Sequence, residues 1–248
     1  MITKIISINI LKDIDIVILT GGQGNRLREV INDRPKTMAE IDHQPFLDIL
    51  IDYISSYGFK RFILCTGYMA SNIEKYYNDK KTDKEILFSR EDNPLGTGGA
   101  IKNAQKLIQS NLFLVVNGDS FCPINFLDFF NFHNDNNALV SMVIVESKEN
   151  RNSGSVVLDK SQKIIQFREK KQSGEKKTFT NAGIYFFKKD IFSLIPPRIN
   201  YSLEYSLFPK LVNREFYGYI TLKKLIDIGT PKGYLKAKKY YKSWIKNQ

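Results

Sequence analysis

The feature that most constrains this chain is a strand pattern near its amino terminus that runs directly into a glycine loop. Residues 14–19 are largely apolar, and Gly21, Gly22 and Gly24 follow at once. A short apolar run bounded by glycines predicts a strand covered on both faces, as in a parallel sheet. Glycines let the backbone approach a ligand, and the exposed N–H groups, together with those of a following helix, form an anion site. This start is typical of nucleotide-binding α/β domains.

The following segments alternate between helix and strand patterns. Helices are predicted over 45–57, 71–77 and 100–108, and strands over 61–65, 85–89 and 112–116. This alternation predicts a largely parallel sheet with helices on both faces. Strand patterns then follow one another over 138–145, 155–158, 164–168, 182–187 and 217–221, before a closing helix over 231–244. We therefore expect one Rossmann-like, three-layer αβα domain over residues 14–248 with a mixed, mostly parallel central sheet. Residues 1–13 form an N-terminal extension, which we interpret as a further strand.

Composition fits this picture and excludes several classes of protein. The 248 residues are 42% hydrophobic and contain no apolar run long enough to span a bilayer. The net charge of +11 comes from scattered lysines without a nucleic-acid-binding motif, so it is compatible with phosphate-bearing substrates but does not select them. Cys65 and Cys122 lack metal-ligand spacing and are expected to be packed, reduced thiols of a cytoplasmic protein. With two histidines, the chain offers little material for a zinc site.

The glycine loop by itself fits more than one function. A dinucleotide-binding fingerprint starting at Gly22 would need a third glycine where the chain has Leu27. A P-loop would need a lysine directly after the glycines, and none is there. A tight turn without a ligand would also explain the glycines. Arg26, whose guanidinium suits phosphate oxygens, and Lys36 after Pro35 favour a phosphate ligand.

With these residues the chain resembles the sugar nucleotidyltransferases, the NDP-sugar pyrophosphorylases. Residues 19–27 followed by Pro35 and Lys36 resemble the family signature, although Asn25 stands where the family usually has Thr or Ser, and Thr37 where it often has Pro. The resemblance continues in the family's order from about residue 14 to residue 234, through 94–99, 117–119, 153–154, 169–170, 181–183 and 227–231. One such match would be weak evidence, but an ordered set identifies the family.

The resemblance implies an enzyme in which the phosphate of a sugar 1-phosphate attacks the α-phosphorus of a nucleoside triphosphate. It implies catalytic roles for Arg26, Lys36 and Asp119, and a Mg²⁺ ion held by Asp119 and Asp227. The implied nucleotide-binding residues are Leu19, Gly21, Gly22, Gly24, Asn25, Glu91, Pro94, Gly96 and Thr97. Those implied for the sugar phosphate are Gly154, Glu169, Lys170, Asn181 and Glu204. Plainer interpretations stay open: a turn residue at Asp119, a helix cap at Asp227 and a solvated charge run at Lys170.

Within the family, residues 94–99 look like the base loop of guanylyltransferases. The short chain and residues 201–204 resemble the D-glycero-D-manno-heptose 1-phosphate guanylyltransferases. This implies GTP as donor and GDP-heptose as product, for capsule or other surface polysaccharide. Mannose 1-phosphate with GTP, or glucose 1-phosphate with CTP or UTP, are the alternatives. A catalytically silent nucleotide-sugar-binding regulator is another, although Lys36, Asp119 and Asp227 argue against it. The expected partners are these small molecules and, from the resemblance, a second copy in a homodimer, but neither nucleic acid nor membrane.

Overall fold

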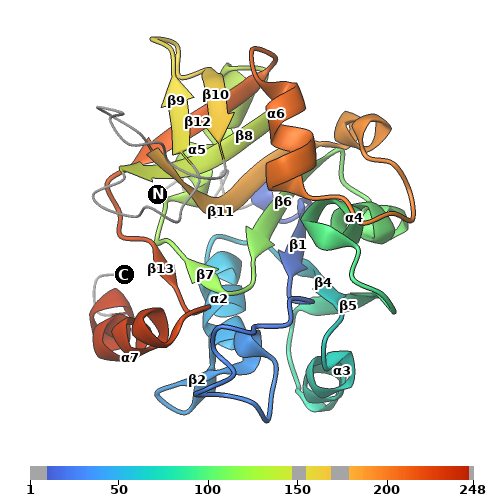
Figure 1. The fold of residues 1–248 in the computed structure, drawn as a ribbon, viewed down its shortest axis with the longest axis vertical. Helices are drawn as coiled ribbons and strands as arrows, with labels where there is room; N and C mark the ends of the chain where they lie inside the picture. The colour runs from blue at the N-terminus through green and yellow to red at the C-terminus, as the bar shows by residue number, and fades with distance from the viewer. Residues whose placement is uncertain (1–9, 147–154, 169–178, 246–248) are drawn as a thin grey trace.

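The computed structural model describes residues 10–146, 155–168 and 179–245, and a nine-stranded sheet runs through the middle of this part of the chain (Figure 1). Its parallel half consists of four adjacent strands in the order β6, β1, β4, β5. These are β1 (Asp15–Leu19), β4 (Arg61–Thr66), β5 (Glu85–Arg90) and β6 (Leu112–Asn117). In β1, Ile16 and Ile18 enter one core and Val17 the other, each with 0% exposure. The apolar run thus forms a strand buried on both faces, as the sequence predicts.

The remaining five strands extend the sheet beyond β6. β11 pairs antiparallel with β6, β8 and β9, β9 pairs antiparallel with β10, and β12 lies parallel to β8. They are β8 (Val140–Glu146), β9 (Ser155–Leu158), β10 (Ile164–Arg168), β11 (Phe179–Lys188) and β12 (Phe216–Thr221). The predicted αβα fold around a mixed central sheet is confirmed.

Helices cover both faces of the sheet and close two apolar cores. One core includes side chains of α2 (Phe46–Ser55), α3 (Ala70–Asp79), α5 (Phe126–Asp135) and α7 (Pro231–Ile245). The other includes side chains of α4 (Gly96–Asn103), η2 (Ala104–Lys106), η3 (Lys189–Leu194), η4 (Leu203–Leu207) and α6 (Phe208–Leu211). Cys65 and Cys122 are buried and unpaired, as expected. Among the described residues, no helix has the length and apolar character that crossing a bilayer requires.

Three local predictions are wrong. α4 begins at Gly96 instead of residue 100, because the glycines that were expected to form a loop adopt helical conformation in its first turn. Residues 25–30 form turns, so the anion loop is not followed by a helix N-terminus. Residues 10 and 11 are helical instead of extended, and Leu11 is buried in the core. Residues 1–9 lie outside the described part, so the extent of the N-terminal extension stays a prediction.

Two of the described α-helices, α5 and the four-residue α6, were not predicted at all. α5 is rich in phenylalanine and has no glycine before it, so it lacks the signals used for the other helices. The side chain of Asn125 nevertheless caps it, accepting hydrogen bonds from the backbone N–H groups of Leu127 and Asp128.

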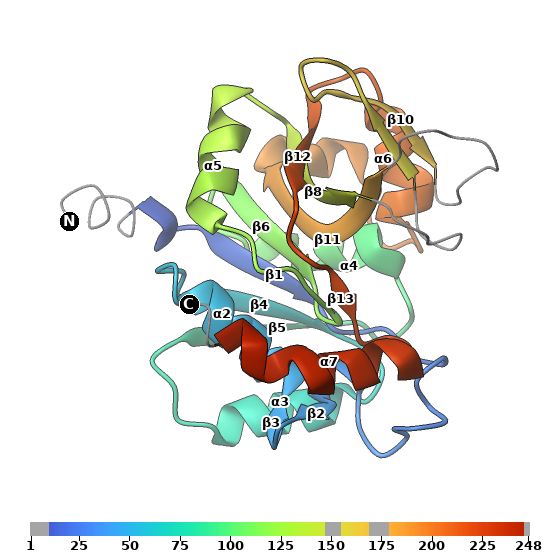
Figure 2. The same ribbon diagram turned by 90° about the vertical axis from the view of Figure 1, so that its left-hand side faces the viewer.

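The topology gathers the predicted site residues at one edge of the sheet. Parallel strands present their carboxyl ends together, so the segments after β1, β4, β5 and β6 meet there. η1 (Lys36–Met38) and the short hairpin β2 (Glu40–Ile41) with β3 (Gln44–Pro45) follow the glycine loop. β13 (Ile226–Asp227) leads into α7 (Figure 2) and pairs with β7 (Ser120–Phe121; Figure 1). This pairing carries a late segment of the chain to the end of β6.

Candidate active site

Lys36 lies beneath the glycine loop and reaches the end of β6. Its Nζ atom contacts Asp119 Oδ2, and the two side chains are only 19% and 16% exposed. A Cβ on Gly22 would lie 3.3 Å from Lys36 Nζ, and one on Gly24 would lie 3.2 Å from Lys36 Cβ. Gly24 also has a φ of 65°, which disfavours larger residues. These two glycines therefore leave room for the lysine as well as freeing the loop backbone.

Asp119 and Asp227 converge on the space beside Gly229. The β7–β13 pairing places Asp227 opposite Ser120, and Ile228 N donates a hydrogen bond to Asp119 O at 2.9 Å. A Cβ on Gly229 would lie 2.8 Å from Asp227 Oδ1 and 3.3 Å from Asp119 Oδ2. The two carboxylates therefore come together although they are far apart in sequence, as the predicted metal site requires.

Positive charge approaches the same place from Arg26. The guanidinium Nη2 atom of Arg26 lies 3.4 Å from the position that a Cβ on Gly229 would take. Burial, and then the negative charge of Asp119, raise the pKa of Asp227, while the N–H of Gly229 and the cations Arg26 and Lys36 oppose this rise. Two carboxylates this close repel each other when both are ionised, and a divalent cation bound between them would relieve this repulsion.

The two carboxylates of Asp119 and Asp227 fit magnesium better than a metal ion whose ligands all come from the protein. In the described parts of the chain, no group of three or more His, Cys, Asp or Glu side chains is placed to hold a metal ion. Mg²⁺ usually takes one or two carboxylates and completes its shell with water and substrate phosphates. Asp119 and Asp227 supply two carboxylates, so the residues present fit a metal that binds together with a polyphosphate.

Glu91 connects the first glycine loop to the second, which we call the base loop (residues 94–99). Its Oε2 atom accepts a hydrogen bond from Leu95 N at 3.1 Å. Its Oε1 atom lies 3.0 Å from the position of a Cβ on Gly21 and 2.9 Å from that of a Cβ on Gly67. Burial raises the pKa of Glu91, with the N–H of Leu95 opposing the rise. The carboxylate is thus half-buried between the two loops predicted to hold the nucleotide.

Thr97 and Glu204, predicted to contact different substrates, contact each other. Thr97 Oγ1 donates a hydrogen bond to Glu204 Oε2 at 2.8 Å, and Ser202 Oγ donates to the same oxygen at 2.9 Å. The structure therefore places Glu204 against the base loop. Its role toward the sugar remains a prediction.

The predicted sugar turn lies on β11 next to the end of β6. Asn181 Oδ1 accepts from Gly183 N at 2.9 Å, and Asn181 Nδ2 donates to Tyr185 Oη at 2.7 Å. Gly183 has a φ of 73°, and a Cβ there would lie 2.6 Å from Asn117 Nδ2. Asn117 Oδ1 is buried without a hydrogen-bond partner among the described residues. The sequence singled out Asn117 only as part of the strand end, whereas its amide faces the sugar turn.

Not every predicted residue can be placed. Gly154, Glu169 and Lys170 lie outside the described residues. Leu19 ends β1, and Asn25 and Pro94 are exposed on the two loops. Gly229 was missed as an individual residue, although the segment 227–231 that contains it was recognised. Gly229 matters because it has no side chain to fill the space between Asp119 and Asp227. The sequence could not show this, because the two carboxylates come together only in the folded chain.

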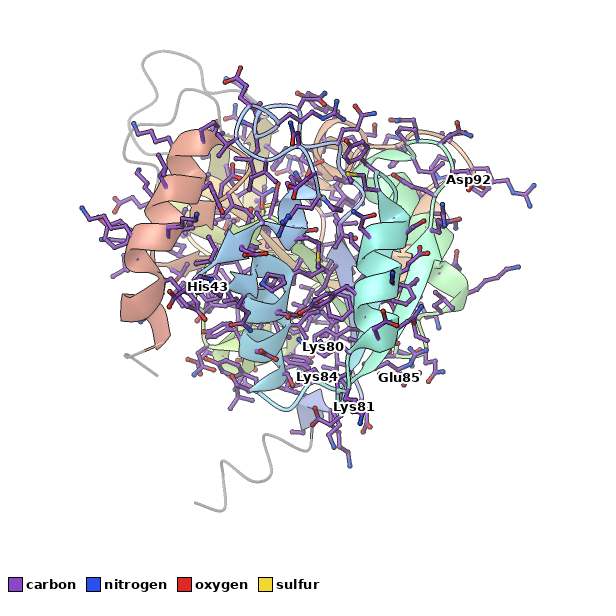
Figure 3. All side chains as sticks on the ribbon, turned by 90° about the horizontal axis from the view of Figure 1, so that it is seen from below. His43, Lys80, Lys81, Lys84, Glu85 and Asp92 are labelled. Atoms are coloured by element: carbon purple, nitrogen blue, oxygen red, sulfur yellow. The ribbon has the colours of Figure 1, made fainter. Side chains whose placement is uncertain are left out.

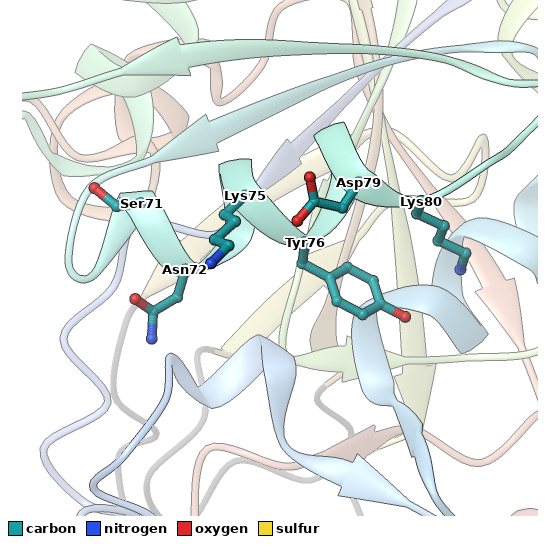
Figure 4. Close-up of a pocket in the computed structure, with 6 residues that line it drawn as sticks. All are labelled: Ser71, Asn72, Lys75, Tyr76, Asp79 and Lys80. Atoms are coloured by element: carbon teal, nitrogen blue, oxygen red, sulfur yellow. The ribbon is translucent and has the colours of Figure 1, made fainter.

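Two hollows of the surface lie away from this cluster. One, of about 740 Å³, follows α3 and is lined by Ser71, Asn72, Lys75, Tyr76, Asp79 and Lys80 (Figure 4). The other, of about 280 Å³, lies near Lys80, Lys81 and Lys84, by the amino end of β5 at Glu85 (Figure 3). At its wall, buried Asp48 accepts hydrogen bonds from Tyr76 and Tyr77 and pairs with Lys80 at 2.7 Å. This network secures α3 on α2 and lies at the sheet edge opposite the carboxylate pair.

Known proteins resemble the chain over nearly its full length. The nucleotidyl transferase family model matches residues 15–243. A D-glycero-alpha-D-manno-heptose 1-phosphate guanylyltransferase of Aneurinibacillus thermoaerophilus is 35% identical over 230 residues, covering 92% of this chain and 99% of that protein. A mannose-1-phosphate guanylyltransferase of Mycobacterium tuberculosis is 31% identical over 228 residues, covering 90% of this chain and 63% of that protein. The crystal structure of HddC from Yersinia pseudotuberculosis complexed with GMP-PN aligns with a TM-score of 0.79 at 35% identity, covering 92% and 99% of the two chains.

Proposed function

The chain belongs to the nucleotidyl transferase family, and from this premise we propose that it transfers GMP from GTP to D-glycero-D-manno-heptose 1-phosphate. A phosphate oxygen of the sugar 1-phosphate forms a bond to the α-phosphorus of GTP. The bond from that phosphorus to the oxygen bridging to the β-phosphate breaks, and pyrophosphate leaves with the electron pair. The products are GDP-heptose and pyrophosphate, and no proton has to be removed from the nucleophile.

The observation that carries this proposal is the cluster of Lys36, Arg26, Asp119 and Asp227 at the end of β1 and β6. Two polyanions must meet in this reaction, and two unit charges about 4 Å apart repel by about 4 kcal/mol at an effective dielectric constant near 20. A penalty of this size corresponds to about three powers of ten in rate. Cations fixed beforehand at the reaction centre remove it without reorganisation.

Each residue of the cluster then has a role. Lys36 stabilises the charge that develops on the α-phosphate, and Arg26 with the loop N–H groups holds the β- and γ-phosphates. The contact with Asp119 holds the Lys36 side chain at the end of β6. Asp119 and Asp227 would hold Mg²⁺, which would supply positive charge to the phosphates of the nucleotide when bound.

Glu91 supports guanine as the base. The Watson–Crick edge of guanine presents N1–H and N2–H₂ as adjacent donors, and a carboxylate accepts from both. Uracil and thymine present one N–H between two carbonyl oxygens, and a carboxylate repels these oxygens. A buried group left without its partner discriminates strongly between substrates, and Glu91 is half-buried between the loops proposed to hold the nucleotide.

The sugar assignment comes from similarity. The relative from Aneurinibacillus thermoaerophilus covers nearly the same length as this chain and is named for the heptose phosphate. The mannose-1-phosphate guanylyltransferase from Mycobacterium tuberculosis makes mannose 1-phosphate the second candidate. Gly154, Glu169, Lys170 and Asn181 remain predicted sugar-phosphate residues. The homodimer also remains a prediction, which the mass of the protein in solution tests.

The test is release of pyrophosphate from GTP, UTP, CTP and dTTP, each with heptose, mannose and glucose 1-phosphates and Mg²⁺. We expect GTP with the heptose phosphate to give the highest kcat/KM. A higher value with mannose 1-phosphate would overturn the sugar assignment. Tight nucleotide binding without release from any pair would indicate the non-catalytic regulator instead.

A further inference from the structure

We propose that residues 199–204, which we call the strap, set the conformation of the base loop, and that Thr97 and Glu204 are positioning residues of this contact. In this proposal neither side chain is a ligand of a substrate. The proposal rests on the proposed guanylyltransferase function, because the base loop and Glu91 are there assigned to the nucleotide.

Backbone hydrogen bonds join the strap to the base loop along its length. Tyr201 O accepts from Gly98 N at 2.8 Å and from Gly99 N at 3.0 Å, and Tyr201 N donates to Leu95 O at 2.8 Å. Asn200 Nδ2 donates to Pro94 O at 2.9 Å. Tyr201 is buried, so water does not compete well for these bonds. The loop is thus held by a segment about a hundred residues away in sequence.

The side chains of Thr97 and Glu204 complete this contact. The Thr97 hydroxyl donates its one proton to Glu204 Oε2 at 2.8 Å and accepts from Leu203 N at 2.8 Å. Ser202 Oγ donates to the same carboxylate oxygen at 2.9 Å and accepts from Glu204 N at 3.1 Å. A hydroxyl has a single proton, so Thr97 has none left to donate to a nucleotide.

The strap also explains the glycines of the base loop. A Cβ on Gly96 would lie 2.9 Å from Tyr201 O, one on Gly98 would lie 3.0 Å from the same oxygen, and one on Gly99 would lie 2.7 Å from Ile199 O. Gly96 also has a φ of 70°. Backbone oxygens cannot move aside as a flexible side chain can. The glycine run is therefore accounted for by the packed strap, without any phosphate.

The contact leads directly to the group proposed to read the base. Leu95 donates its N–H to Glu91 Oε2 and receives the Tyr201 N–H at its carbonyl oxygen. A displaced strap would therefore shift Leu95 and release Glu91 from its position. The consequence should appear in nucleotide binding and base selection, and not in binding of the sugar phosphate.

Two pairs of variants test this. Thr97→Val replaces the hydroxyl with a methyl group of similar size, and Thr97→Ser keeps it. Glu204→Ala removes the acceptor, and Glu204→Gln keeps an oxygen that accepts. We expect Thr97→Val and Glu204→Ala to raise the KM for GTP by up to about tenfold, the limit set by one hydrogen bond that holds the base loop in its binding conformation, and to leave the KM for heptose 1-phosphate within about twofold. Thr97→Ser and Glu204→Gln should restore the KM for GTP to within about threefold.

Thr82→Val is the matched control, because Thr82 accepts one hydrogen bond, from Lys84 N, at the opposite edge of the sheet. It should change neither KM. A raised KM for heptose 1-phosphate with unchanged KM for GTP in Glu204→Ala would make Glu204 a sugar ligand and overturn the proposal. A fall in kcat with both KM values unchanged would also overturn the proposal, because the contact would then support the fold without affecting nucleotide binding.

Calorimetric titration of GTP, without sugar phosphate, separates this proposal from the function itself. If the unmodified protein turned over no substrate pair, the proposed function would fail. GTP binding weakened about tenfold in Thr97→Val and restored in Thr97→Ser would still support the strap. Equal GTP affinity in the two variants would overturn it.

Discussion

Protonation of His133 should make the protein less stable as the pH falls from neutral toward 4. The side chain is 0% exposed, Nδ1 lies 2.9 Å from Ser141 Oγ, and Nε2 has no hydrogen-bond partner among the described residues. Burial, and then the positive charge of Lys188, lower the pKa of His133 from 6.5 to about 4. The folded protein therefore resists a proton that the unfolded chain accepts at pH 6.5.

The sign and size follow from this difference. The pKa of His133 is lower in the folded state than in the unfolded chain. Its contribution to the free energy of unfolding is therefore fully present above pH 6.5 and is lost progressively as the pH falls toward 4. Each pKa unit corresponds to about 1.4 kcal/mol, so the whole contribution is about 3 kcal/mol, and about 2 kcal/mol is lost by pH 5. Urea unfolding at pH 7.5, 6.5, 5.5 and 5.0 measures it.

The matched comparison is with His133→Asn, which keeps a hydrogen-bonding group for Ser141 but does not titrate. The variant should be less stable at pH 7.5 and should lose about 2 kcal/mol less than the unmodified protein between pH 7.5 and 5.0. If the free energy of unfolding fell equally with pH in the unmodified protein and in His133→Asn, the role given to His133 would be refuted.

Three further predictions concern the site and its support. Glu91→Gln should lower the ratio of kcat/KM for GTP over UTP at least about tenfold, because a charged acceptor is lost; an unchanged ratio would exclude Glu91 from base selection. Gly183→Ala should raise the KM for the sugar phosphate and not for GTP, because its Cβ would lie 2.6 Å from Asn117 Nδ2, and steady-state kinetics with each substrate varied will show which KM moves. Asp48→Ala should lower the free energy of unfolding by about 3–5 kcal/mol in urea titrations, because it leaves Lys80 and two tyrosine hydroxyls without their acceptor. Turnover by the folded Asp48→Ala protein should be unchanged, and a stability equal to that of the unmodified chain would contradict the role given to this network.

Much of the fold could be predicted because local pattern and final environment agree. The apolar run of β1 becomes a strand buried on both faces, and α2 ends at Ser55, in the turn before Gly58. α4 was misjudged because its glycines read as loop residues, whereas the strap holds them in the first helical turn. A contact between residues this far apart in the chain leaves no periodic signal near Gly96.

In the candidate site, too, some features could be predicted from the sequence and others could not. The family resemblance assigned Lys36 and Asp119 to one reaction centre, but their direct contact at the end of β6 is known only from the structure. The partner of Glu204 could not be predicted, since a single glutamate after Leu203 carries no information about which loop it will face. The space beside Gly229 was likewise visible only once β13 had paired with β7.

Pyrophosphate release from GTP and heptose 1-phosphate, compared between the unmodified chain and Lys36→Met, tests the central claim most directly. We expect the unmodified protein to release one pyrophosphate for each GDP-heptose formed. Lys36→Met should lose at least about a hundredfold in kcat, the usual effect of removing one group that stabilises transition-state charge. Its unfolding curve should remain cooperative, and its affinity for GTP should change much less than kcat. Near-normal turnover by Lys36→Met would contradict the account.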